Sequence, residues 1–514
     1  MRMTSAMFSS VGRGTPGLVR GCALAAVLAL AGCAVNALDQ APKSASEPWQ
    51  QGERTATQPG TVKSFAVAPD PEVAKIDAAP AIDPSRSYGL PELIDIAQSN
   101  NPTTRLAWLQ ARQAALTQGM VESTFLPLIS AHVVAGRQRV SGALDTDLLG
   151  RVNAPTVTVD GAAPAVSLVW LLFDFGQRSA LREAAQHNSI AANVLFNGAH
   201  QKLIFEVANA YFLYGAARSR TRIARQTLAN AREIEAAAQA RMNSGLGNAV
   251  ELAQAKQQAA QASFNLVQAQ GAENAAYLAL IGAMGISPMA KIKVADASGR
   301  RLPSNFEAPT EQAIRAALAR RPDVLAAYQA MKAARADVKA AQAEFLPKVY
   351  LAATAAGGNT GFNVGHLPSI GQQGSTSGVL IGATVPLFDG GLRAAHLKKM
   401  EELAASSETI FNRVRSDAVR EIIAATDTLR SAMASYRAAT ELVRAAETTW
   451  KAAVASYKAG TSSITIATAA DTGLLAARQA QADAHAAALV AAANLAFVLG
   501  ALDSSATASG LLAQ

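Results

Sequence analysis

The sequence predicts an α+β fold in which one unit, a pair of strands followed by a long helical hairpin, occurs twice. Three observations support this prediction. The same short motifs recur in the same order about 220 residues apart, which indicates an internal repeat. The stretch from Leu392 to Ala459 contains neither glycine nor proline, as a very long helix requires. Stretches that alternate apolar and polar residues, rich in β-branched side chains, precede the long helices and are typical of strands.

The first residues are typical of an export signal. Arg2, Arg13 and Arg20 form a basic region, and residues 22–30 form an apolar stretch too short to span a bilayer as a helix. The Leu-Ala-Gly-Cys sequence that ends at Cys33 resembles the bacterial lipobox, which predicts a signal peptide at 1–32 and a lipidated Cys33. The alternative is a plain signal peptide with a small-residue cleavage site. Alanine rather than aspartate follows the cysteine, which favours the outer membrane over retention in the inner membrane.

Composition excludes several classes of function. Of 514 residues, 50% are hydrophobic but only 5% are aromatic, and alanine dominates the hydrophobic half, which suits long helices packed closely together. The formal net charge of +8 is spread without a basic cluster interleaved with aromatic residues, so no nucleic-acid binding is expected. Cys33 would be the single cysteine of the mature chain, which excludes a disulfide. Residues 33–87 are rich in Pro, Ala, Ser and Gln and predict an extended linker.

From Tyr88 onward the chain repeats itself. The matching landmarks of the two copies are Asn101-Pro102 with Arg321-Pro322, Phe125-Leu126-Pro127 with Phe345-Leu346-Pro347, Leu172-Phe173-Asp174 with Leu387-Phe388-Asp389, and Gly245 with Gly460. Landmarks that keep the same order indicate a duplication. We therefore predict a first repeat at 88–300, a second repeat at 301–502 and a C-terminal tail at 503–514.

The elements expected in each repeat follow one order. A helix runs from Pro91 to Thr124, with a break at Asn101-Pro102 because proline disfavours the helical conformation of the residue before it. Strands follow, separated by loops rich in Gly, Asn, Ser or Asp. The predicted strands are Leu128–Ala135, Thr156–Phe173 with an interruption at Gly161–Pro164, Lys348–Ala355 and Ser377–Phe388.

Very long helices come next. In the second repeat, Leu392–Ala459 would reach roughly 100 Å at about 1.5 Å per residue, and after a turn at Gly460 a second helix runs from Ile464 to Gly500. In the first repeat, Gln177–Arg241 and Ala249–Ile281 repeat this arrangement. Such lengths indicate coiled-coil packing. The larger apolar residues at helical spacing are Phe411, Val414, Ile422, Leu429, Met433, Tyr436, Val443, Trp450, Val454 and Tyr457, with Ala418 among them.

The strands also predict an oligomer. Four strands cannot close a membrane barrel, and open sheet edges are not tolerated in lipid. Three copies would supply about twelve strands, which lies in the range known for outer-membrane barrels.

These motifs resemble those of the TolC-type outer membrane efflux family over nearly the whole mature chain, from Tyr88 to about Leu502. The most specific are the duplicated Asn-Pro or Arg-Pro helix, Phe-Leu-Pro, and the Phe-Asp-Gly-Gly sequence that begins at Phe388. The resemblance implies a homotrimer with a shared 12-strand outer-membrane β-barrel and a periplasmic α-helical coiled-coil barrel. It also implies a periplasmic adaptor (membrane fusion protein) and an inner-membrane pump of the RND, MFS or ABC type as partners.

The resemblance leaves the cargo open. The lipidated N-terminus resembles that of members of the drug-efflux branch. The Phe-Asp-Gly-Gly motif is more similar to that of members that serve type I secretion, including secretion of RTX cyclase-haemolysin-type toxins. The family also implies that the two hairpin turns contact the adaptor. In this sequence these turns contain Gly245, Leu246, Gly460 and Thr461.

The gate departs from the family pattern. Two aspartates that narrow the pore of the best-known member correspond here to Ile466 and Ala469, and an arginine that helps to latch the gate corresponds to Ser462. The family also has an acidic position shortly after the glycine of the first hairpin turn, here Gly245, at the periplasmic tip. Glu251 matches this position. We therefore expect Ile466 to form an apolar constriction and Glu251 an acidic ring. Asp471 is a further acidic candidate.

Other functions find little support. The sequence contains no nucleophile elbow, phosphate loop or HExxH motif, and its histidines lack metal-ligand spacing, so no enzyme, cofactor or metal site is expected. His396 is interpreted as a surface residue of the long helix. The competing interpretation is a periplasmic adaptor or a coiled-coil structural lipoprotein, which would also have a lipobox and a helical hairpin. Adaptors normally contain one hairpin rather than two tandem units.

Overall fold

The computed structural model describes residues 82–141, 143–146, 150–153, 156–297, 299–300, 302, 306–364, 370–500 and 502, with short stretches at 41–42, 44–46, 65–67 and 69–75. The chain divides into two units, residues 1–78 and residues 79–514. The elements below belong to the second unit. The predicted signal peptide and Cys33 lie outside the described residues.

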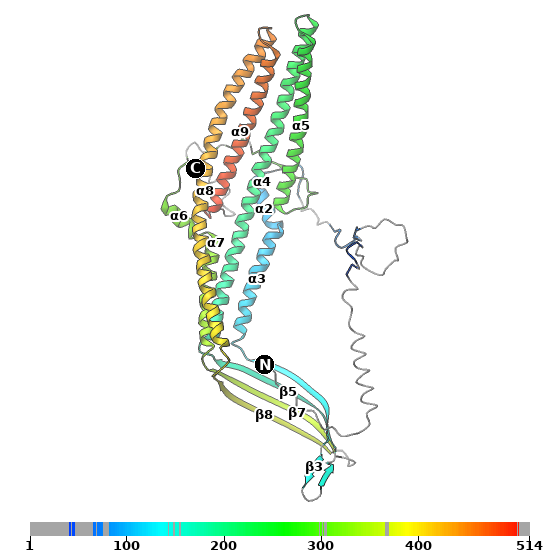
Figure 1. Cartoon of the computed structure of the whole chain (residues 1–514), viewed down its shortest axis with the longest axis vertical. Helices are drawn as coiled ribbons and strands as arrows, with labels where there is room; N and C mark the ends of the chain where they lie inside the picture. The colour runs from blue at the N-terminus through cyan, green and yellow to red at the C-terminus, as the bar shows by residue number, and fades with distance from the viewer. Residues whose placement is uncertain are drawn as a thin grey trace, which may run out of the picture. The chain divides into compact units, whose positions relative to one another are not determined.

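The helices have the predicted order in both halves of the chain (Figure 1). The helices of the first half are α2 (Leu90–Asn100), α3 (Pro102–Ser123), α4 (Gln177–Asn243) and α5 (Ala249–Met284). Those of the second half are α6 (Glu311–Leu318), α7 (Pro322–Ala343), α8 (Leu392–Lys458) and α9 (Ile464–Val498). The break at Asn101-Pro102 and the long helices are confirmed. Both α4 and α8 contain 67 residues, so the two halves keep the same spacing.

Four long strands form one antiparallel sheet in the order β2-β5-β7-β8. They are β2 (Leu128–Val140), β5 (Val157–Phe173), β7 (Lys348–Val364) and β8 (Ile370–Thr384). Two small ladders were not predicted. One is the hairpin of β3 (Ala143–Thr146) and β4 (Gly150–Asn153), and the other is the parallel pair of β1 (Ser87–Tyr88) and β6 (Lys293–Val294).

All four strand predictions were wrong in detail. The strand predicted to end at Ala135 reaches Val140, the one predicted to end at Ala355 reaches Val364, and the one predicted to begin at Ser377 begins at Ile370. The expected interruption at Gly161–Pro164 does not occur, because Pro164 still lies opposite Val133 of β2 and the strand continues through it. The pairing of β5 with β7 skips this position, so the missing N–H of proline costs a hydrogen bond on one side only. The strand expected to reach Phe388 ends at Thr384, just before Pro386.

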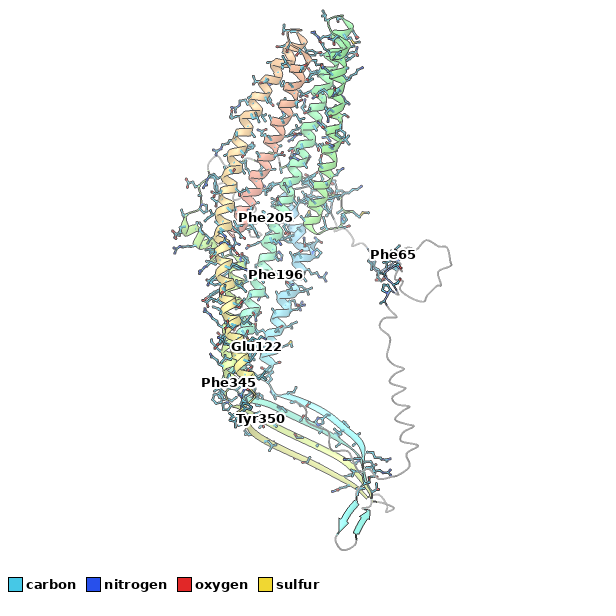
Figure 2. The ribbon with its side chains drawn as sticks, in the orientation of Figure 1. Phe65, Glu122, Phe196, Phe205, Phe345 and Tyr350 are labelled. Carbon is cyan, nitrogen blue, oxygen red and sulfur yellow. The ribbon has the colours of Figure 1, made fainter. Side chains whose placement is uncertain are left out.

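The repeated Leu-Phe-Asp motif makes the junction between sheet and helices. Asp174 Oδ2 accepts hydrogen bonds from the backbone N–H (2.9 Å) and Nε (2.8 Å) of Arg178, whose guanidinium lies over the Phe125 ring at 4.7 Å. In the second half Asp389 binds Arg393 in the same way, and that guanidinium lies over Phe345. Figure 2 shows Phe345 where the sheet meets the helices. In both halves the motif thus links the first turn of the long helix to the phenylalanine that precedes the strands.

The other repeated motif ties each hairpin to the helix that precedes its strands. Asn101 caps α3 by accepting from Thr103 N (2.8 Å), and its amide donates to the Ala283 carbonyl near the end of α5 (3.1 Å). Arg321, at the start of α7, donates from Nη1 to the Val498 carbonyl at the end of α9 (3.2 Å). Different side chains therefore make the same connection in the two halves.

Gly285, which ends α5, supports the first of these connections. Its φ is +67°, and a Cβ there would lie 2.7 Å from Nδ2 of Asn101. We expect Gly285→Ala to lower the free energy of unfolding by about 2–4 kcal/mol, from left-handed strain and overpacking. Gly282→Ala is the control, because a Cβ at this helical position meets nothing within 4 Å and should stabilise by about 0.5–1 kcal/mol. Thermal unfolding followed by circular dichroism measures both, and equal shifts would contradict the expectation.

Candidate functional site

The turns at the ends of the two hairpins have the same geometry. Gly245 and Gly460 have φ values of +71° and +76°. The N–H of Leu246 donates to the Arg241 carbonyl and that of Thr461 to the Ser456 carbonyl, each at 2.9 Å. This six-to-one bond is the Schellman ending, which a glycine favours because it accepts a positive φ. The four residues predicted for adaptor contact therefore lie in exposed, structurally equivalent turns.

The two turns are held together within one chain. Arg241, at the end of α4, donates to the carbonyls of Leu246 (3.1 Å) and Tyr457 (3.5 Å), and its guanidinium lies 5.3 Å from the centre of the Tyr457 ring. Lys458 forms an ion pair with Glu233 of α4. Beneath them lies an apolar cluster drawn from all four long helices, consisting of Ile234, Ala238, Leu252, Ala255, Val454, Tyr457, Ile464 and Ala467.

The polar groups in this region are incompletely satisfied. Among the described residues, five side-chain polar atoms are buried without a hydrogen-bond partner: Arg241 Nε, Glu251 Oε2, Trp450 Nε1, Tyr457 Oη and Asp471 Oδ2. All five lie within a few helical turns of Gly245 or Gly460. Burying a polar group without a partner costs free energy. The packing of the hairpins near the tips is therefore less favourable than that of an apolar core.

The two predicted constriction residues lie in different environments. Ile466 is 56% exposed on α9, and Ala469, one helical turn further on, is also exposed. Glu251 is half-buried on α5. Burial raises the pKa of the Tyr457 phenol, and the Glu251 carboxylate raises it further. The two candidates occupy equivalent positions of the repeat, each six residues after its tip glycine, but they differ in side chain and in exposure.

Asp471 is fully buried whereas Glu251 is half-buried, so the expectation that the two acidic residues are similarly placed was wrong. The Asp471 side chain is 1% exposed and lies between α9 and α4, where its Oδ1 accepts from Asn230 Nδ2 at 3.0 Å. Burial raises the pKa of this carboxyl, while Asn230 and the charge of Arg478 oppose the shift. The contact of Asp471 with Asn230 could not be predicted, because no short sequence pattern indicates which face of α9 packs against α4.

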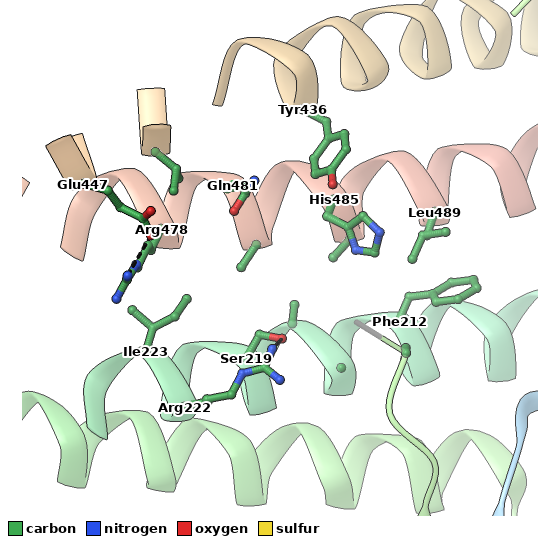
Figure 3. A pocket seen from close by; sticks show the side chains of 16 residues that line it. Phe212, Ser219, Arg222, Ile223, Tyr436, Glu447, Arg478, Gln481, His485 and Leu489 are labelled. Carbon is green, nitrogen blue, oxygen red and sulfur yellow. Dashed lines mark hydrogen bonds and ion pairs between the residues drawn. The ribbon is translucent and has the colours of Figure 1, made fainter. Parts of the chain in front are cut away.

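Further from the tips, α4, α8 and α9 line a partly open pocket of about 270 Å³ (Figure 3). Arg478 of α9 and Glu447 of α8 form an ion pair at 2.7 Å on its wall. His485 Nε2 lies 2.8 Å from the Arg300 carbonyl, and its ring contacts that of Tyr436. Aromatic and charged side chains thus connect the two helices of the second hairpin beside α4.

His396 lies at the surface of α8, as predicted, with its side chain 41% exposed and its Nδ1 3.0 Å from Glu344 Oε2. Within the described part of the chain, no group of three or more His, Cys, Asp or Glu residues is placed to hold a metal ion. No helix in this part of the chain has the length and apolarity needed to cross a membrane.

The fold and its tips define a class of protein: two tandem strand-and-hairpin units with an open-edged sheet at one end and glycine turns at the other. A family model described as "Outer membrane efflux protein" matches residues 93–286 and 313–501, and the chain belongs to this family. It is therefore an outer-membrane channel component of an export system, in a family of transport proteins rather than enzymes. The adaptor interpretation is set aside.

Three similar proteins each match about two thirds or more of the chain. Protein CyaE of Bordetella pertussis is 28% identical over 70% of this chain and 73% of its own length. Outer membrane protein OprJ of Pseudomonas aeruginosa is 29% identical over 68% and 71%. The probable outer membrane lipoprotein SilC of Salmonella typhimurium is 26% identical over 68% and 70%.

Solved structures share the fold. A structure of CusC superposes with a TM-score of 0.67 at 21% identity, over 83% of this chain and 99% of that one. The outer membrane protein VceC of Vibrio cholerae gives a TM-score of 0.64 at 22% identity, over 80% and 96%.

Proposed function

We propose that three copies of this chain share one twelve-stranded barrel in the outer membrane and that their hairpins form a tube into the periplasm. The open-edged sheet carries this proposal. Among the described strands, β2 and β8 each pair on one side only, and an open edge in lipid would leave backbone groups without partners. The edges are also apolar and exposed, with Val133 at 67% and Ile381 at 74%. Closure with other copies would pair the open edges, and lipid would cover the apolar side chains that point outward from the barrel.

The partners and the anchor belong to the same proposal. Residues 1–32 would be removed and Cys33 lipidated, so that residues 33–87 link the lipid to the channel. The exposed turns at Gly245, Leu246, Gly460 and Thr461 would contact a periplasmic adaptor, which connects the tube to an inner-membrane pump of the RND, MFS or ABC type. The names of relatives indicate different cargoes, as in "Cation efflux system protein CusC" and "Pyoverdine export outer membrane protein OpmQ". The channel would be passive, with cargo chosen by pump and adaptor.

Gene deletion and gel mobility test this function. Deletion should abolish export of the cargo of the neighbouring pump, and a plasmid copy should restore it. The purified chain should migrate as a trimer in SDS without boiling and as a monomer after boiling, because a shared barrel unfolds slowly. A chain that always migrates as a monomer and fractionates with the inner membrane would refute the proposal.

The proposed pore constriction at Glu251 and Ile466 can be tested separately. Glu251→Gln should reduce cation selectivity and Ile466→Asp should increase it, because an acidic ring in a narrow pore attracts cations. Single-channel currents in planar bilayers under a salt gradient measure this through the reversal potential. Glu273→Gln, which removes the same charge from α5 far from the tip, serves as the control. Unchanged selectivity in both tip variants would remove these residues from the constriction.

A further inference from the structure

Another pocket is formed by α3, α4 and α7, three helices of the same chain. It is partly open and has a volume of about 390 Å³. Its apolar lining residues are Ala114, Val121, Leu181, Ala184 and Ala185. A volume of this order and a mostly apolar wall with a few polar groups are typical of small-molecule sites.

The polar groups of this pocket can all accept hydrogen bonds. They belong to Thr117, Asn188 and Asp337, and no described Arg, Lys or His residue lines the pocket. An ionised carboxylate only accepts. The Thr117 hydroxyl donates to the Gln113 carbonyl at 2.9 Å, so it offers only its lone pairs to a ligand. The Asn188 amide can present its oxygen. A ligand that matches this pocket therefore brings donors.

The carboxylate of Asp337 has no counter-charge. Its side chain is partly buried, and no described residue forms an ion pair or a hydrogen bond with it. By contrast, the other carboxylate of α7, Asp323, lies 2.6 Å from Arg321, and Glu183 of α4 lies 3.1 Å from Lys339. Burial raises the pKa of Asp337, and no neighbouring charge opposes the shift. The pocket thus keeps a carboxylate that nothing in the described chain compensates.

We propose that this pocket binds small apolar amines. The ammonium group would donate to the Asp337 carboxylate and to the oxygens of Asn188 and Thr117, while the apolar part would cover Leu181 and Val121. An ammonium group supplies both the missing positive charge and three donors, which match a pocket of acceptors. An alcohol of the same shape would lack the charge, and a carboxylic acid would be repelled.

The position of the pocket on α4 connects it with export. Leu203, Val207 and Tyr211 of α4 pack in the cluster that also contains residues of α2 and β6. At 3.6 residues per turn, Ala184 and Asn188 point roughly the opposite way. Elements inside a tube would obstruct it, so α2 and β6 would lie outside and the pocket inside, along the path of the cargo. The inner position therefore rests on the proposed function.

Calorimetry with naphthylmethylamine tests the binding. The full chain is reconstituted in lipid nanodiscs, empty nanodiscs give the background, and naphthylmethanol serves as the uncharged ligand of the same shape. The wild type should bind the amine about tenfold or more tightly than the alcohol, because hydrogen bonds to a charged group are stronger. Asp337→Asn should remove this preference, since asparagine keeps the shape of the side chain without its charge.

Two further variants separate the role of Asp337 from general effects of charge and shape. Glu183→Gln removes a charge from α4 outside the pocket and should leave the preference for the amine unchanged. Ala114→Leu fills the apolar part of the pocket and should weaken binding of both compounds. Equal affinity of the wild type for both compounds, or an unchanged preference in Asp337→Asn, overturns the proposal. If the same preparations still migrate as SDS-resistant trimers, the proposed function stands.

Biotin on introduced cysteines tests which face of α4 lines the tube. Asn188→Cys and Gln186→Cys replace exposed residues that lie about 160° apart around the helix. Streptavidin is too large to enter a twelve-stranded barrel. It should therefore capture biotin at position 186 in the native trimer, and biotin at position 188 only after unfolding. The reverse pattern in an SDS-resistant trimer overturns the inner position. The absence of any SDS-resistant trimer would refute the proposed function instead, and the preference for the amine would still test the pocket by itself.

Discussion

Replacing Arg241 with glutamine should raise the single-channel conductance several-fold. The Arg241 guanidinium donates to the carbonyls of Leu246 and Tyr457 and lies over the Tyr457 ring, so it joins the first tip to the end of α8. Hydrogen bonds from a charged group contribute about 1.5–3 kcal/mol. Of these contacts, the bond to the Tyr457 carbonyl and the ring contact join the two hairpins, and their loss would shift an equilibrium between packed and parted tips by about tenfold. Currents in planar bilayers measure the change.

The comparison with other charges on the tips isolates the role of Arg241. Arg232→Gln removes the same charge from an exposed position on α4 and should leave conductance unchanged. Lys458→Gln should have a smaller effect than Arg241→Gln, because the Lys458–Glu233 ion pair is half-exposed and such pairs contribute about 0–1 kcal/mol. Equal conductance of the wild type and Arg241→Gln would show that the contact does not hold the tips together.

Replacing Asp471 with asparagine should raise the thermal unfolding midpoint at neutral pH. The wild-type carboxyl is buried between α9 and α4 with one oxygen unpartnered, so its charged form is disfavoured in the folded state. Asparagine keeps the acceptor for Asn230 and removes the charge. Asp471→Ala should instead destabilise by about 1–3 kcal/mol, because Asn230 Nδ2 would then be buried without an acceptor.

The pH dependence of this effect follows from the direction of the pKa shift. Burial raises the folded-state pKa of Asp471 above its ordinary value of 3.8. Between these two pKa values the folded state binds more protons than the unfolded state. Stability from this group is therefore greatest below pH 3.8, falls as pH rises through the folded-state pKa, and is constant above it. The advantage of Asp471→Asn should disappear towards pH 3.8 and be largest above the folded-state pKa.

The control for this prediction is Asp483→Asn on the same helix. Asp483 pairs with Arg220 at the surface, so its replacement should shift the midpoint slightly. Circular dichroism melts at several pH values in detergent measure all variants. A lower midpoint for Asp471→Asn at every pH would show that the carboxylate is stabilised where it lies.

Several elements were predictable because their causes are local. The absence of glycine and proline determines α8, the glycines at 245 and 460 determine the turns, and Asn101-Pro102 determines the break between α2 and α3. The repeated Leu-Phe-Asp motif indicated the junctions, although its bonds to arginine were visible only in the structure. The predicted interruption at Pro164 was wrong because the effect of the missing N–H depends on which neighbouring strand would have accepted a hydrogen bond from it.

The sequence by itself determined the duplicated unit, its helices and its turns, since periodicity and backbone preferences act over a few residues. Only the tertiary structure decided that Asp471 is buried against Asn230 while Ile466 is exposed, although both lie on α9. It also decided that α7 is covered on two sides and α3 on one. These differences depend on which helix faces meet across hundreds of residues, and many alanine-rich faces would pack almost equally well.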